Sequence, residues 1–97
     1  MDLALVLLRF PDVSRTAAFL LRSLVSNQLR VVDMFGLLGD GDYAICLPHT
    51  DHKGAAIVAA RVRTQMAGFS PRVGVATYGQ DGTDFVGLLA TAESRLC

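Results

Sequence analysis

Two acidic side chains stand in a short glycine-rich turn near the middle of the chain, and carboxylates in turns are common ligands of divalent cations. The turn covers residues 39–42 and carries Asp40 and Asp42. It resembles part of a calcium-binding loop, but it lacks the spacing of the later ligands and the final glutamate. His49 and His52 lie close by, and a metal site there would need further ligands that the sequence does not supply. We therefore interpret these histidines as residues of a solvated loop.

A second candidate site is the pair Arg30 and Asp33, which precedes this turn. A guanidinium can donate two hydrogen bonds to O6 and N7 of guanine, and a carboxylate can accept from the ring N–H and amino group on the other edge. The same pair can equally be a solvated ion pair at a helix-to-strand junction, worth under about 1 kcal/mol. The residue types and their spacing leave both interpretations open.

Buried strands and amphipathic helices are expected to position these residues. A continuous apolar run predicts a strand over Leu3–Arg9. Apolar residues at helical spacing predict a helix from about Arg15 to Leu29. Val31–Leu38 and Tyr43–Leu47 are predicted to pair as a hairpin around the turn at 39–42.

One more strand and two more helices are predicted in the second half. Thr50 is expected to cap a helix that runs to about Ala67, with a buried face of Ala55, Val58, Ala59, Val62 and Met66. Arg72–Tyr78 reads as a strand in which Gly74 marks a close backbone approach. Thr83 is expected to cap the last helix, with an apolar face of Phe85, Leu88, Leu89, Ala92 and Leu96.

The predicted order is β-α-β-β-α-β-α, which indicates an α+β domain. It matches a ferredoxin-like split β-α-β plan with an antiparallel sheet and helices packed on one side, to which the final helix is an addition. The sequence shows no linker, repeat or low-complexity segment. We therefore expect one domain over residues 1–97, a length that suits a single small core.

The central segment also carries an ordered set of motifs. These are Arg30-Val31-Val32-Asp33, the turn Gly39-Asp40-Gly41-Asp42, and the strand Tyr43-Ala44-Ile45-Cys46-Leu47-Pro48. They resemble the centre of a GGDEF (diguanylate cyclase) domain. Residues 50–63 and 72–89 are similar to that family's next helix and its later strand, loop and helix. The resemblance covers residues 30–96 well and the first 29 more loosely, and it implies a shortened GGDEF/nucleotidyl-cyclase-like fold.

The resemblance implies a degenerate, catalytically inactive domain. A diguanylate cyclase joins two GTP molecules and needs carboxylates that hold divalent metal against the triphosphates. The family's carboxylate at the end of the first strand is matched here by a position near Arg9, and the acidic third residue of the signature is matched by Gly41. Asp40 and Asp42 are neighbours, but a shift of one residue in a tight turn redirects a carboxylate strongly. We therefore expect no enzyme activity, no catalytic residue and no metal or other cofactor.

The connection from Phe10 to Leu29 supports the same expectation. It has room for one helix only, whereas the family uses a helix after the first strand to read guanine. This guanine-reading segment is expected to be deleted. Residual cyclase activity through Asp40 and Asp42 is a third and minor possibility.

Two functions then remain for such a pseudoenzyme. The first is a regulatory protein-interaction or dimerisation module in bacterial cyclic di-GMP signalling. The alternative is a cyclic di-GMP receptor, because active members of the family often carry an inhibitory Arg-x-x-Asp site before the signature. Arg30 and Asp33 match that site, with Arg61 as the natural further arginine and Arg63 as the second choice.

The composition limits the kinds of partner and the cellular location that we expect. Nine basic residues balance nine acidic ones, which argues against strong nonspecific binding to nucleic acid or to anionic membranes. The apolar fraction of 52% supports a core and leaves apolar surface for a protein partner or self-association. No run is long enough to span a bilayer, so a cytoplasmic location is expected. Cys46 lies in an apolar run and is expected to be a buried thiol.

Overall fold

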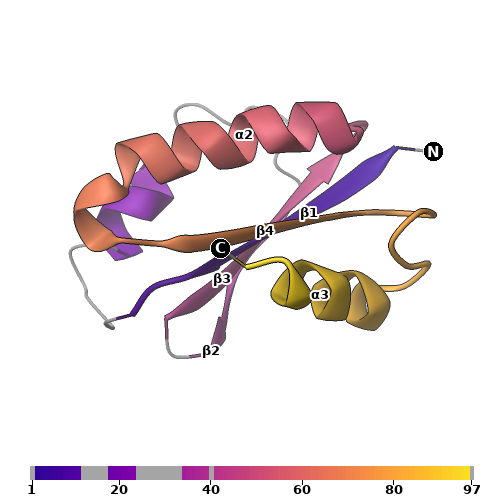
Figure 1. Cartoon of the computed structure of the whole chain (residues 1–97). Coiled ribbons are helices and arrows are strands. Elements are labelled where there is room, and N and C mark those ends of the chain that lie inside the picture. The colour runs from indigo at the N-terminus through magenta and orange to yellow at the C-terminus, as the bar shows by residue number, and fades with distance from the viewer. Residues whose placement is uncertain (1, 12–17, 24–33, 40, 97) are drawn as a thin grey trace.

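The computed structural model describes residues 2–11, 18–23 and 41–96, together with the backbone of residues 34–39 (Figure 1). The strands are β1 (Leu3–Arg9), β2 (Met34–Gly39), β3 (Asp42–Pro48) and β4 (Arg72–Thr77). The helices are α2 (His52–Gln65) and α3 (Phe85–Ser94), with a short 3₁₀ helix η1 (Ala67–Phe69) after α2. Residues 18–23 are helical, which agrees with the predicted first helix over that stretch.

The strands form one antiparallel sheet in the order β2-β3-β1-β4. β1 is central and pairs with β3 on one side and β4 on the other. In this register Arg9, the last residue of β1, lies opposite Asp42 of β3 and Arg72 of β4. The chain is therefore a small α+β domain with an antiparallel sheet, as the order of predicted elements indicated.

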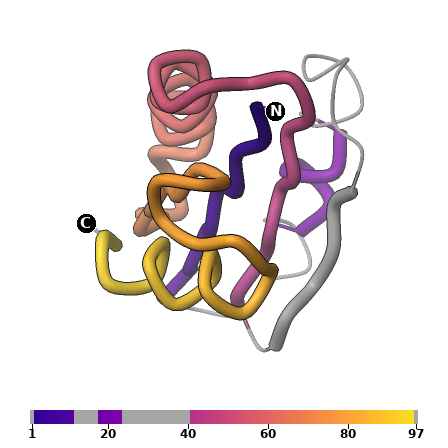
Figure 2. Tube along the Cα trace, turned by 90° about the vertical axis from the view of Figure 1, so that its right-hand side faces the viewer, coloured from indigo at the N-terminus to yellow at the C-terminus, as the bar shows by residue number. Residues whose placement is uncertain are grey.

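The helices cover both faces of this sheet (Figure 2). Helix α2 and residues 18–23 share one face, as the split β-α-β plan predicts, and the added helix α3, whose side was not predicted, lies on the other. Ala4, Val6 and Leu8 of β1 pack with α2 and with Leu21 on one face. On the other face, Leu5 and Leu7 pack against α3. The physical reason lies in β1 itself, since a strand that is apolar at every position from Leu3 to Leu8 needs cover on both sides.

The predicted buried face of α2 is confirmed, but its predicted cap is wrong. Ala55, Ala59, Val62 and Met66 are buried, and Val58 packs at their margin. Asp51, not Thr50, caps the helix, because its carboxylate accepts from the backbone N–H of Gly54 at 2.8 Å. The Thr50 hydroxyl donates instead to the carbonyl of Pro48 at 3.0 Å.

A similar correction applies to α3. Asp84, not Thr83, is the cap and accepts from the N–H of Gly87 at 2.7 Å. Leu88 and Ala92 are buried as expected, whereas Phe85 is 44% exposed and lies outside the core. Thr83 and Asp84 are both good caps by type, so position alone decides which of them acts.

Gly74 is the point at which β4 and α3 touch. A Cβ atom built on Gly74 would overlap the backbone carbonyl of Ala92 in α3. The predicted close backbone approach is thus confirmed, and only glycine allows the helix to settle this near the strand. Cys46, expected to be buried, is only half-buried in β3.

Candidate functional site

The first polar site lies where β1, β3 and α3 converge. Arg9 donates to both carboxylate oxygens of Asp42, from Nε to Oδ1 at 2.9 Å and from Nη2 to Oδ2 at 3.0 Å. Its Nη2 also donates to Oε2 of Glu93 in α3 at 2.9 Å. The Arg9 and Asp42 side chains are 33% and 25% exposed, so this pair is shielded from solvent in part.

Arg9 is a permanent cation in this arrangement. Its hydrogen bonds to Asp42 and, next, to Glu93 hold the pKa of the guanidinium well above its ordinary value. Two parallel hydrogen bonds between planar groups also fix the direction of the Asp42 carboxylate. A divalent cation that took both oxygens of Asp42 would have to compete with this guanidinium.

The turn before Asp42 is closed by the backbone of Phe10. Gly41 has a φ of +80°, and its carbonyl accepts from the N–H of Phe10 at 2.9 Å. A Cβ atom at Gly41 would lie 2.8 Å from the Phe10 carbonyl oxygen. Position 41 therefore has no room for a side chain unless the turn moves.

The residues next to Gly41 and Asp42 that were expected to form a degenerate signature turn are Gly39, Asp40 and Tyr43. Gly39 ends β2, and Tyr43 follows Asp42 in β3 with its ring set edge-on to Phe10 at a centroid distance of 5.8 Å. Asp40 lies outside the described residues.

The predicted cyclic di-GMP ligands are described only in part. Arg30 and Asp33 lie outside the described residues. Arg61 lies in α2 and is exposed, as is Arg63 two residues later. The proximity of Arg61 to the other two therefore stays a prediction.

A second polar site joins the end of β4 to the end of α3. Asp81 and Arg95 form a two-point ion pair, with Nη2–Oδ1 at 2.8 Å and Nη1–Oδ2 at 3.0 Å. Asp81 also accepts from the backbone N–H of Thr77 at 2.8 Å and from its hydroxyl at 3.1 Å. The pKa of the Asp81 carboxyl lies below its usual value, chiefly because Arg95 donates hydrogen bonds to it. Partial burial acts in the opposite direction, and the hydrogen bonds from Thr77 lower the pKa further.

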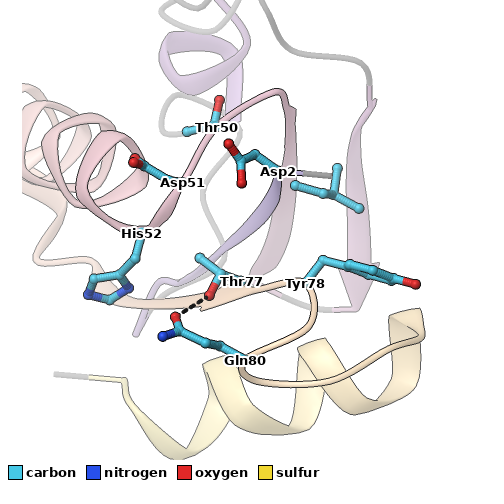
Figure 3. Close-up of a pocket in the computed structure, with 8 residues that line it drawn as sticks. Asp2, Thr50, Asp51, His52, Thr77, Tyr78 and Gln80 are labelled. Atoms are coloured by element: carbon cyan, nitrogen blue, oxygen red, sulfur yellow. Dashed lines mark hydrogen bonds between the residues drawn. The ribbon is translucent and has the colours of Figure 1, made fainter.

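Three cavities surround this second site. The largest, of 520 Å³, is lined by His52, Gln80, Asp81 and Arg95. A second, of 190 Å³, lies at the starts of β1 and α2 and is drawn in Figure 3, where the Thr77 hydroxyl bonds to Gln80. The third, of 260 Å³, runs along β4 beside α2.

Sequence reasoning missed Glu93, Asp81 and Arg95. The contact between Arg9 and Asp42 could have been predicted, because the last residue of one antiparallel strand faces the first residue of its partner strand. Asp81 and Arg95 are 14 positions apart across a turn and a helix, and no sequence signal indicates their contact.

The described part of the chain contains no group of three or more histidine, cysteine, aspartate or glutamate residues placed to hold a metal ion. Within it, no helix combines the length and apolar character needed to cross a membrane. No protein-family model matches the sequence, and no curated protein matches it significantly.

Proposed function

We propose that this chain is a shortened, noncatalytic domain of the GGDEF type that acts as a cytoplasmic protein-interaction module. The strand order β2-β3-β1-β4, with every pair antiparallel, supports a ferredoxin-like split β-α-β plan. The resemblance of the hairpin at residues 34–48 to the centre of that family supports the more specific assignment.

The observation that carries the proposal is the two-point bond between Arg9 and Asp42. In a metal-dependent cyclase the end of the first strand and the signature turn would present carboxylates to a divalent cation. Here a guanidinium takes that place and binds the nearest carboxylate of the turn through both oxygens. Gly41 adds a second obstacle, because the backbone of Phe10 leaves no room for an acidic side chain.

Exposed apolar side chains support a role in interaction. Phe19 is 70% exposed on the helical residues 18–23, Ile57 is 56% exposed on α2, and Val86 is 74% exposed at the start of α3. These side chains are the candidate contacts for a partner or a second copy, because contiguous apolar surface is what marks an interaction site.

The test of inactivity is GTP turnover with Mg²⁺ or Mn²⁺, followed by chromatographic detection of cyclic di-GMP and pyrophosphate. We expect no product, and metal-dependent product would overturn the proposal. Sedimentation equilibrium over a wide concentration range tests self-association separately. A monomer at every concentration would exclude the dimeric form and leave a different protein as the partner.

A cyclic di-GMP receptor is the second candidate, favoured by the exposure of Arg61. Calorimetric titration of cyclic di-GMP tests it, with micromolar binding corresponding to about −8 kcal/mol. Arg30→Ala and Arg61→Ala are expected to abolish that binding while the protein stays folded. Equal binding by these variants and the wild type would contradict the assignment of the site.

A further inference from the structure

The last helix, α3, is held to the rest of the chain by charged side chains at its C-terminal end. Oε2 of Glu93 accepts from Arg9, the last residue of β1, at 2.9 Å. Arg95, the C-cap of α3, donates to both carboxylate oxygens of Asp81 at 2.8 and 3.0 Å. It also donates to the carbonyl of Val75 in β4 at 3.2 Å. We name the two ion pairs, Arg9–Glu93 and Asp81–Arg95, the α3 latch.

The partners of α3 in this latch keep other hydrogen bonds when the helix leaves. Asp81 also accepts from the backbone N–H and the hydroxyl of Thr77. Arg9 also makes its two-point bond to Asp42. The two side chains that α3 contributes are exposed, so they return to water at little cost. Opening of the α3 latch therefore leaves no buried charge without a partner.

The apolar contact of α3 is the smaller part of the core. Among the described residues, the cluster on the α2 face of the sheet contains twelve buried residues and the cluster on the α3 face contains six. Within α3 itself only Leu88 and Ala92 are buried, whereas Phe85 and Val86 in its first turn are exposed. Detachment of α3 thus leaves the larger cluster intact and requires less free energy than unfolding of the whole chain.

The contact between α3 and β4 favours an opening that is complete rather than gradual. The backbones meet directly, because a Cβ atom at Gly74 would overlap the carbonyl of Ala92. Closely packed interfaces have discrete arrangements and not a continuous range of them. The turn at residues 78–84 can accommodate the open arrangement, since Gly79 has a φ of +91° and no atom lies within 4 Å of its Cβ position.

We propose that α3 is a detachable cover that opens as one unit, under the control of the α3 latch, while the sheet and α2 stay folded. Opening uncovers the second face of the sheet, where Leu5, Leu7, Ala44 and Ala76 lie beneath the helix. The device makes an apolar surface available only in the open state, and screening of the exposed ion pairs by salt increases the population of that state. This inference goes beyond the noncatalytic assignment and does not depend on it.

Hydrogen exchange of nitrogen-15-labelled protein under native conditions tests the opening. We expect the amides of residues 88–94 in α3 to exchange at least about tenfold faster, relative to unstructured peptides, than those of residues 4–8 in β1. The exchange of α3 should also depend less steeply on low concentrations of urea, because its opening exposes less surface than global unfolding. Equal protection and equal urea dependence of α3 and β1 would overturn the proposal.

Val62→Ala separates the opening of α3 from global unfolding. Val62 is buried on the α2 face of the sheet, so its packing is lost only when the whole chain unfolds. We expect this variant to speed the exchange of β1 by about tenfold or more and to leave α3 unchanged. The same acceleration in both elements would show that α3 never opens by itself.

Arg95→Gln tests the α3 latch, and Arg61→Gln on the exposed surface of α2 is its control. The bonds of Arg95 are lost both in the open state and in the unfolded state. We therefore expect Arg95→Gln to speed exchange in α3 and β1 by the same factor, roughly three- to tenfold, and Arg61→Gln to change either by less than about twofold. An Arg95→Gln variant that exchanges like the wild type would exclude the latch. None of these results bears on GTP turnover, which tests the noncatalytic assignment separately.

Discussion

Arg9 and Asp42 face each other across the β1–β3 pair and are joined by two hydrogen bonds of 2.9 and 3.0 Å. Glu93 of α3 binds the same guanidinium at 2.9 Å. One cation therefore connects the central strand, the hairpin and the last helix. The guanidinium supplies the positive charge that holds these two carboxylates near each other.

Replacing Arg9 by alanine is expected to lower the thermal unfolding temperature. The change leaves the carboxylates of Asp42 and Glu93 close together without a counter-charge. Arg9→Lys is expected to recover only part of the loss, since an ammonium cannot make the two-point bond. Arg72→Ala is the control, because Arg72 lies opposite Arg9 on β4 and is exposed. Unchanged melting of Arg9→Ala by calorimetry would show that the network does not stabilise the fold.

Gly41→Ala is expected to cost about 1–3 kcal/mol of unfolding free energy. The substitution combines a positive φ of +80° with a contact of 2.8 Å to the Phe10 carbonyl. Gly79→Ala is the matched control, because Gly79 has a φ of +91° and open space around its Cβ position. Urea unfolding should show the smaller loss for Gly79. Equal losses would mean that the Phe10 contact relaxes freely, and an acidic residue would then fit at position 41.

Gly74→Ala is expected to destabilise the protein by about 2 kcal/mol or more. The added methyl group meets the Ala92 carbonyl, so α3 must move away from β4 and uncover part of its face of the sheet. Gly68→Ala serves as the comparison, because its Cβ would meet nothing within 4 Å. Urea midpoints that fall equally for both variants would contradict the close approach.

Acid is expected to weaken the contact between Asp81 and Arg95. The folded-state pKa of Asp81 lies below its unfolded value, so its contribution to stability is present above the unfolded pKa of about 3.9. That contribution disappears as the pH falls through the lower folded pKa. Asp81→Asn should therefore be less stable than the wild type at pH 7, and the difference should shrink below pH 4. A constant difference down to pH 2 would contradict this account.

Much of the fold follows from local pattern. The apolar run of β1 and the helical spacing in α2 are strong signals, and both elements lie where they were predicted. The position of α3 was not predicted, because its apolar face shows that it packs but not on which side of the sheet. The caps Asp51 and Asp84 were each missed by one residue, since two competent side chains stand in sequence at both helix starts.

The candidate site was less predictable than the fold. Arg9 was identified as a cation at the end of the first strand, but its bond to Glu93 depends on how α3 packs. The Asp81–Arg95 pair depends on a turn and a helix that fold back on β4. Arg30 and Asp33 lie outside the described residues, so their role stays a prediction.

Titration of Mn²⁺ into nitrogen-15-labelled protein tests the central claim most directly. A paramagnetic ion broadens the amide signals of residues close to its binding site. If Arg9 occupies the place of the metal, the signals of residues 9, 42 and 93 will stay sharp at millimolar Mn²⁺, and cation-dependent GTP turnover will be absent. Selective broadening around Asp42 in the wild-type protein would show that the metal displaces Arg9, and it would contradict the account.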